Sequence, residues 1–100
     1  MKLKSLSKTK AIIESFDEEY EFELDPDYDN KWHGFFRFIF DDTNFNKLKE
    51  LKHAAGVLNT LVELKEFDSR IKIEFDGDRS GEFFNITIEK RTMVKLINQF

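Results

Sequence analysis

The sequence predicts an α+β fold: a small single domain in which a four-stranded, mainly antiparallel sheet packs on a central amphipathic helix. Three observations lead to this prediction. The chain has 100 residues, a length that suits one hydrophobic core. Several short stretches alternate apolar with polar residues, as strands do, and one long stretch repeats apolar residues at helical spacing. We therefore expect one domain over residues 1–100 with the element order α-β-β-α-β-β-α, in which residues 1–6 form a frayed basic N-terminus.

The first expected element is a short helix from about Ser7 to Glu18. Ile13, Phe16 and Tyr20 follow one another at intervals of three and four residues, which would place them on one face of a helix. From Tyr20 onward the period changes to two, because Glu21 and Glu23 separate Tyr20, Phe22 and Leu24. This alternation is typical of a half-buried strand.

A turn and a second strand are expected next. Pro26 lies among Asp and Asn residues, and these residue types favour turns. The run Gly34 to Phe40 then predicts a strand, since alternate side chains of a strand point to opposite faces. We expect one face of this strand to lie toward the core and the other away from it; the core-facing residues are Phe36, Phe38 and Phe40, and the others are Phe35, Arg37 and Ile39.

The central helix is expected over about Asn44 to Leu64, after cap residues at Asp41, Asp42 and Thr43. Its apolar residues recur at threes and fours: Phe45, Leu48, Leu51, Ala55, Leu58 and Val62. Gly56 leaves an alternative open, because glycine often ends helices and Val57 to Lys65 would then form an extra strand. The spacing continues across Gly56, which favours one helix.

A hairpin and a last helix complete the predicted fold. Apolar and polar residues alternate in two stretches on either side of a loop over 76–81, which is typical of a β-hairpin. The apolar residues are Ile71, Ile73 and Phe75 in the first stretch and Phe84, Ile86 and Ile88 in the second. From Thr92, apolar residues at helical spacing predict a short C-terminal helix, with a continued strand as the alternative.

Composition excludes several classes of function. The chain has no Cys, which rules out disulfides, thiolate metal sites and cysteine nucleophiles. No apolar run approaches the ~18 residues of a transmembrane helix, and the basic start MKLKSLSKTK leads into no signal-peptide core. We therefore expect a cytoplasmic protein.

Charge is distributed unevenly along the chain. Residues 11–30 hold nine acids and no Lys or Arg. Because the whole chain carries −4, the other eighty residues carry +5. Acids clustered on a strand and its turn usually form a solvated face, but such a row also attracts a basic surface.

Two acidic stretches resemble the start of a calcium-binding loop, in which carboxylates at alternate positions gather around the ion. They are Asp25, Asp27, Asp29 and Asn30, and then Asp76, Asp78, Ser80 and Gly81. Neither stretch supplies the bidentate Glu that the pattern requires at its twelfth position, so solvent-exposed acidic turns are favoured. His33 and His53 do not stand at a metal-binding spacing. No cofactor is expected.

Catalytic motifs are also missing from the sequence. No nucleophile elbow frames a Ser, and no glycine-rich loop is present to bind phosphate. Glu63 and Lys65, with Asp42 upstream, resemble a metal-dependent nuclease triplet, but they fall on a predicted helix rather than a strand. We expect a non-enzymatic protein.

The leading hypothesis is a protein-binding module, a small acidic inhibitor or adaptor that docks on the basic surface of a nucleic-acid-handling protein. Its expected electrostatic contacts are Glu19, Glu21, Glu23, Asp25, Asp27 and Asp29, and its aromatic anchors are Tyr28 and Trp32. Phage anti-defence proteins and toxin-neutralising proteins are often small, acidic and free of cofactors, and the comparison with them is an analogy only. Abundant Lys, Phe, Ile and Asn are consistent with a low-GC bacterium or its phage.

Two alternatives remain open. The run His33 to Phe40 shares exposed aromatics with the strand signature of RNA-recognition motifs, although Arg37 stands where that signature has its second stacking aromatic. A single-stranded RNA or DNA binder would use Phe35, Arg37 and Phe83 for stacking, with Lys72 contacting phosphate. We expect a helix to cover this strip instead. The second alternative is a structural subunit of a homo-oligomer.

Overall fold

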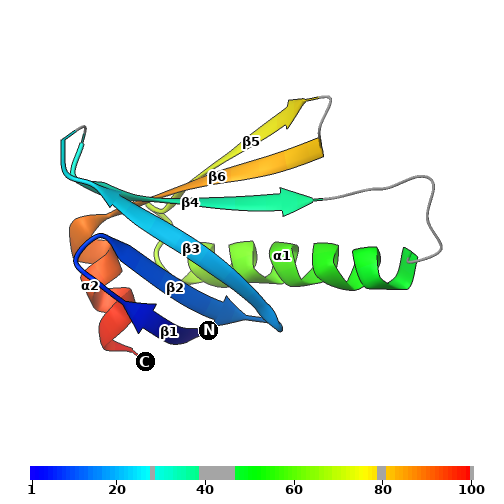
Figure 1. The fold of residues 1–100 in the computed structure, drawn as a ribbon, viewed down its shortest axis with the longest axis horizontal. Helices are drawn as coiled ribbons and strands as arrows, with labels where there is room; N and C mark the ends of the chain where they lie inside the picture. The colour runs from blue at the N-terminus through cyan, green and yellow to red at the C-terminus, as the bar shows by residue number, and fades with distance from the viewer. Residues whose placement is uncertain (28, 39–46, 79–80, 100) are drawn as a thin grey trace.

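In the part of the chain that the structure describes, the fold is a six-stranded antiparallel sheet with two helices (Figure 1). The computed structural model describes residues 1–27, 29–38, 47–78 and 81–99. Its elements are β1 (Lys2–Leu6), β2 (Lys10–Ser15), β3 (Glu18–Asp25), β4 (Lys31–Phe38), α1 (Lys47–Phe67), β5 (Lys72–Asp78), β6 (Gly81–Glu89) and α2 (Lys90–Asn98). The strand order across the sheet is β1-β2-β3-β4-β6-β5. The prediction of a four-stranded sheet packed on a central helix is therefore wrong.

The two additional strands come from the N-terminal residues, where we expected a frayed end and a helix. Ala11 and Ile13 of β2 are fully buried and alternate with more exposed neighbours. A two-residue turn at Phe16 and Asp17 then reverses the chain, and β3 pairs with β2 so that Ile13 lies opposite Tyr20. Apolar residues on both sides of such a turn mimic helical spacing, which explains why the sequence pattern indicated a helix.

The turn between β2 and β3 has a positive φ at both central residues, 50° at Phe16 and 64° at Asp17. Two positive values define the type I′ turn, whose twist matches that of the strands it joins. The pairing of Ser15 with Glu18 closes the turn. The tip of this hairpin packs on α1 at Gly56, where an added Cβ would lie 3.3 Å from the Phe16 carbonyl oxygen.

Helix α1 runs through Gly56 without a break, so the prediction of one helix is confirmed and the alternative strand over 57–65 is wrong. The glycine permits the close approach of the β2–β3 hairpin. The helix continues to Phe67, beyond the predicted end at Leu64. The predicted cap residues 41–43 lie outside the described residues.

Both helices lie on the same face of the sheet (Figure 1). Strand residues that point to this face form one core with Val57 and Leu64 of α1 and with Met93 and Leu96 of α2; the main ones are Ala11, Ile13, Tyr20, Phe22, Trp32, Phe36, Ile86 and Ile88. The predicted core position of Phe36 is thus confirmed, whereas the side chains of Phe38 and Phe40 lie outside the described part.

The C-terminal half contains the predicted hairpin and helix, but the predicted loop over 76–81 is wrong, because β5 extends to Asp78 and β6 begins at Gly81. Strands β5 and β6 form an antiparallel hairpin in which Ile73 lies opposite Ile86. Helix α2 begins directly after β6, at Lys90, so the continued strand is wrong. Within the described residues, neither helix is long and apolar enough to cross a membrane.

Candidate interaction face of the sheet

The face of the sheet opposite the helices carries most of the side chains that the sequence analysis selected. Side chains alternate between the two faces of a strand, so the outward residues of β3 are Glu19, Glu21 and Glu23, and those of β4 include His33, Phe35 and Arg37. Neither described helix packs on this face. The expectation that a helix covers Phe35 and Phe83 is therefore wrong. The N-terminal segment forms strands, and α2 buries its apolar side in the same core as α1.

Phe35, Phe83 and Arg37 form a cluster on this open face. The rings of Phe35 and Phe83 lie with their centroids 4.9 Å apart, and the Arg37 guanidinium lies 5.5 Å from the centroid of Phe83. This geometry permits a cation–π interaction. Phe35 remains 52% exposed, so its ring is available to a binding partner.

The acidic row of β3 lies beside lysines from β1 and β2. Lys10 Nζ is 3.1 Å from Glu21 Oε1 and 3.5 Å from Glu23 Oε1, while Lys4 pairs with Glu19. The hydrogen bond with Glu21 and the charge of that carboxylate raise the pKa of Lys10 above its ordinary value, and Glu19 does the same for Lys4. Exposed ion pairs of this kind stabilise the fold only weakly, because solvent screens the two charges. A partner's cation can therefore replace a lysine at small cost.

A shallow hollow lies between the acidic row and the aromatic cluster. Its lining residues are Glu19, Glu21, Glu23, His33 and Phe35. They meet because β3 and β4 are neighbours and Glu23 lies directly opposite His33. Carboxylates beside an exposed aromatic ring suit an ammonium or guanidinium group, which gains charge-assisted hydrogen bonds and ring contact together.

The acids of the β3–β4 turn stabilise the turn itself. The Asp27 backbone N–H donates to Asp25 Oδ1 at 3.2 Å, and the Lys31 N–H donates to Asp29 Oδ1 at 3.2 Å. Partial burial opposes the charge of Asp29, but hydrogen bonds from His33 and Lys31 outweigh it and hold the pKa of Asp29 below its ordinary value. These carboxylates therefore have local partners, and only the β3 row borders the hollow.

One of the two predicted aromatic anchors, Trp32, is not on this face. Trp32 is 6% exposed and belongs to the core. It is adjacent to His33 on β4, so its side chain points to the opposite face of the sheet. Its ring is therefore not accessible to a partner at the surface of this fold. Tyr28 lies outside the described residues.

The weak calcium-site prediction finds no support in the geometry of the described residues. Asp76 lies within strand β5, not in a loop, and Ser80 is outside the described part. In residues 1–27, 29–38, 47–78 and 81–99, no three His, Asp or Glu side chains gather as ligands for a metal ion. Lys72, the predicted phosphate contact, pairs with Glu74 of its own strand at 2.9 Å.

The nuclease-like triplet is also not assembled by the described residues. Glu63 lies 3.7 Å from the N-terminal amine and accepts a hydrogen bond from Ser15 at 3.4 Å. Lys65 donates instead to the Ser69 carbonyl at 3.1 Å. Asp42 lies outside the described part.

Comparison of the chain with protein-family models, curated proteins and solved structures gives no match. The open face therefore has to be interpreted from its own chemistry. The contribution of His33 to the hollow was missed from sequence. The strand period of two could have identified it, because His33, Phe35 and Arg37 are alternate residues of β4 and therefore share one face.

Proposed function

We propose that this chain is a protein-binding module that docks on a basic surface of its partner through the open face of the sheet. The observation that carries the proposal is the hollow in which Glu21 and Glu23 lie beside the half-exposed ring of Phe35. An Arg or Lys side chain of the partner would enter this hollow, and Phe35 replaces Trp32 as the proposed aromatic anchor. Such a module would act as an inhibitor or adaptor of a protein that handles nucleic acid, since those proteins present large basic surfaces.

Electrostatics favour a basic partner over nucleic acid at this position. Glu19, Glu21 and Glu23 are half-exposed in their ion pairs and border the Phe35 ring directly. A phosphate chain that stacked a base on Phe35 would approach these carboxylates and be repelled. A cationic side chain of the partner would instead displace Lys4 or Lys10 from its glutamate and pair with that carboxylate in its place.

Single-stranded nucleic acid is the second candidate. The observation that favours it is the exposed Phe35–Phe83 pair with Arg37 over the Phe83 ring, since stacked aromatics with a nearby cation can bind bases. The β3 carboxylates oppose this alternative, so the two candidates make opposite predictions about substitution of the acids.

The test is fluorescence anisotropy with two labelled probes, an arginine-rich peptide and an oligodeoxythymidine strand. We expect the peptide to bind, and the double variant Glu21→Gln/Glu23→Gln to weaken binding by about tenfold, which corresponds to ~1.4 kcal/mol. The matched control Glu74→Gln/Glu89→Gln removes the same charge from β5 and β6 on the same face and should leave the affinity nearly unchanged.

Phe35→Ala tests whether the peptide binds in the hollow itself or only to the acidic surface in general, because this variant changes no charge. We expect it to weaken peptide binding as well. Equal losses in both glutamine variants, or an unaltered affinity in Phe35→Ala, would show that the peptide senses only net charge and would overturn the proposal. Binding of the oligonucleotide in preference to the peptide would support the second candidate.

A further inference from the structure

Helix α1 has a second apolar side that its own sheet does not cover. Leu51, Leu58 and Val62 are 57%, 50% and 54% exposed, and the exposed Ala55 lies between them. The spacing of four, three and four residues is that of the a and d positions of a coiled-coil seam. The sheet-facing side of α1 is separate, and its residues Ala54, Val57, Leu61 and Leu64 are buried. We name Leu51, Ala55, Leu58 and Val62 the α1 stripe.

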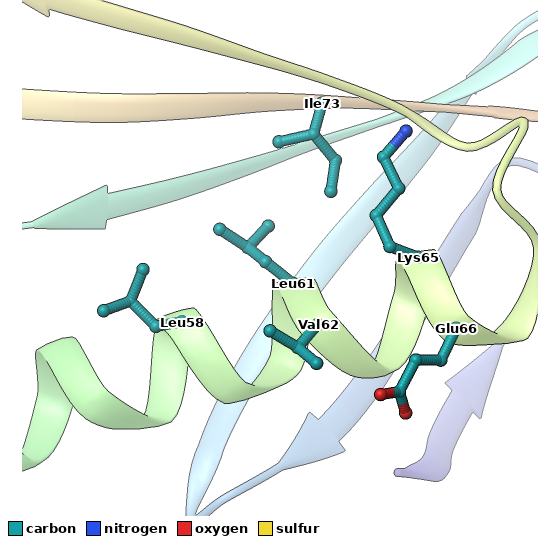
Figure 2. A pocket seen from close by; sticks show the side chains of 6 residues that line it. All are labelled: Leu58, Leu61, Val62, Lys65, Glu66 and Ile73. Carbon is teal, nitrogen blue, oxygen red and sulfur yellow. The ribbon is translucent and has the colours of Figure 1, made fainter.

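Strand β5 forms the edge of the sheet next to this stripe. Among the described residues, it pairs with β6 on one side only, and Phe75 on its helix-facing side is 59% exposed. Ile73 of β5 lines one groove together with Leu58 and Val62 of α1, as Figure 2 shows. An edge strand without protection is a template for pairing with another chain. The edge and the stripe are thus parts of one continuous apolar surface.

We propose that a second copy of this chain covers this surface, with the two β5 strands paired antiparallel across a two-fold axis and the two α1 stripes facing each other. A two-fold interface uses the same patch on both copies, so each patch must be complementary to itself. Both β5 and the α1 stripe satisfy this condition.

The charges of β5 are self-complementary in an antiparallel pair centred on Ile73. Lys72 then lies opposite the partner's Glu74, and by symmetry Glu74 lies opposite the partner's Lys72. Lys72 and Glu74 of one strand pair with each other at 2.9 Å, but both side chains are exposed, at 66% and 57%, so each can exchange this partner for its counterpart across the edge. On the helix-facing side, Ile73 meets the partner's Ile73. Unlike charges and apolar side chains placed directly opposite each other stabilise a strand pair.

The spacing of the α1 stripe agrees with the same arrangement. Antiparallel helices with facing stripes place Leu51 opposite the partner's Val62 and Ala55 opposite the partner's Leu58. Apolar side chains then meet along the whole stripe, and each contact occurs twice by symmetry. A partner with a different sequence would have to reproduce both the apolar stripe and the charge pattern of β5, whereas a second copy supplies them by symmetry.

A charge-reversal experiment tests the strand pairing. Molar mass is measured by sedimentation equilibrium for the wild type, for Lys72→Glu and for Glu74→Lys. We expect a wild-type dimer and a dissociation constant at least about tenfold weaker in each variant, because like charges then lie opposite each other. An equimolar mixture of the two variants should form a dimer again, since each reversed residue then faces an unlike charge. Glu89→Lys on β6 is the matched reversal that should leave the dimer intact.

A second pair of variants tests the helix contact. Leu58→Glu places a charge in the α1 stripe and should give a monomer, while Val94→Glu on the exposed side of α2, where Val94 is 50% exposed, should remain a dimer. Circular dichroism confirms that both variants fold. A wild type that stays monomeric at millimolar concentration overturns the proposal. So does a mixture of the two charge-reversed variants that behaves like each variant alone. Neither result depends on binding of the basic peptide at the open sheet face.

Discussion

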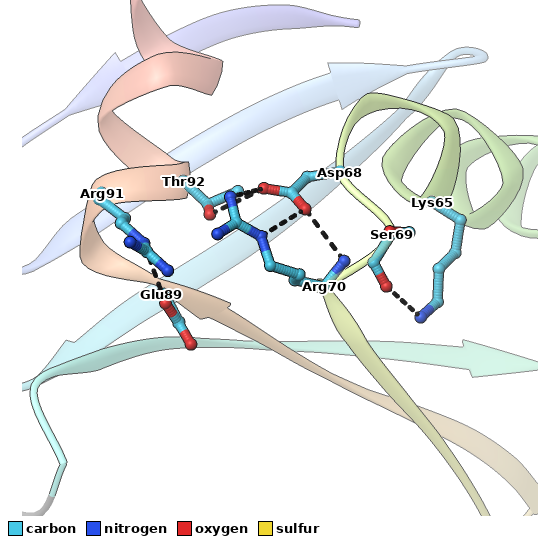
Figure 3. Close-up of polar contacts among 7 residues, drawn as sticks. All are labelled: Lys65, Asp68, Ser69, Arg70, Glu89, Arg91 and Thr92. Atoms are coloured by element: carbon cyan, nitrogen blue, oxygen red, sulfur yellow. Dashed lines mark hydrogen bonds and ion pairs between the residues drawn. The ribbon is translucent and has the colours of Figure 1, made fainter.

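Thr92 donates a hydrogen bond to Asp68, with Thr92 Oγ1 and Asp68 Oδ2 3.1 Å apart, and so ties α2 to the segment that joins α1 to β5 (Figure 3). The same carboxylate accepts hydrogen bonds from Arg70: the backbone N–H at 3.0 Å, Nε at 3.1 Å and Nη2 at 2.9 Å. One side chain therefore fixes the start of β5 relative to α2. This contact orients the edge strand on which the proposed dimer depends.

Asp68→Asn should reduce the free energy of unfolding at neutral pH. The Arg70 side chain and N–H, with the Thr92 hydroxyl, hold the pKa of Asp68 well below its usual range. A carboxyl with a lowered folded-state pKa contributes stability above its unfolded pKa, about 3.9, and loses it as the pH falls through the folded value. The difference between wild type and variant should be largest near neutral pH and shrink below about pH 4. Urea denaturation at pH 7 and pH 3 measures it, with exposed Asp76→Asn as the control.

Gly34→Ala should destabilise the fold by about 1–3 kcal/mol, the usual cost of overpacking a core. An added Cβ at Gly34 would lie 2.3 Å from the Phe22 ring, which is buried in the core at 1% exposure. Gly77→Ala is the matched control, because the nearest side-chain atoms there belong to Phe75 at 3.6 Å. Chemical denaturation compares the two. Equal stabilities would mean that the Phe22 ring does not occupy the space above Gly34.

His53→Gln should remove a pH-dependent part of the stability. Partial burial lowers the pKa of His53, but hydrogen bonds to Glu18 at 2.8 Å and to the Arg37 carbonyl at 2.7 Å, with the charge of Glu18, outweigh burial and raise it. A raised folded-state pKa gives stability that is full below the unfolded value, about 6.5, and is lost as the pH rises through the folded value. We expect the wild type to lose up to about 1 kcal/mol relative to the variant between pH 5.5 and 8.5. Titration of the His53 ring by NMR gives the folded-state pKa, and Glu18→Gln should lower it.

Asp17→Gly should stabilise the fold by up to about 1 kcal/mol, because glycine adopts positive φ without a steric penalty. Asp17 has φ 64° in the type I′ turn between β2 and β3. Asp27→Gly is the contrasting variant, since Asp27 is not among the residues with positive φ and glycine there only adds freedom to the unfolded chain. Thermal denaturation should move the two melting temperatures in opposite directions. A lower melting temperature for Asp17→Gly would show that the Asp17 side chain itself stabilises the turn.

The sequence predicted an element correctly where a single repeat of apolar residues extends over the whole element. Alternation at Tyr20, Phe22 and Leu24 identified β3, and continued helical spacing across Gly56 identified α1. The N-terminal prediction failed because the spacing of Ile13, Phe16 and Tyr20 spans a turn. Ile13 belongs to β2, Phe16 to the turn and Tyr20 to β3, so the three-four interval arises from a chain reversal that no local pattern reveals.

The sequence by itself determined that Glu19, Glu21 and Glu23 share one face of a strand, because side chains alternate with a period of two. Only the tertiary structure decided which face the helices cover, and hence that Phe35 remains exposed beside this row. It also decided that Lys4 and Lys10 lie next to the acids, since strand pairing brings together residues far apart in the chain. Both outcomes depend on long-range packing, in which the burial of a whole sheet face against α1 and α2 outweighs local preference.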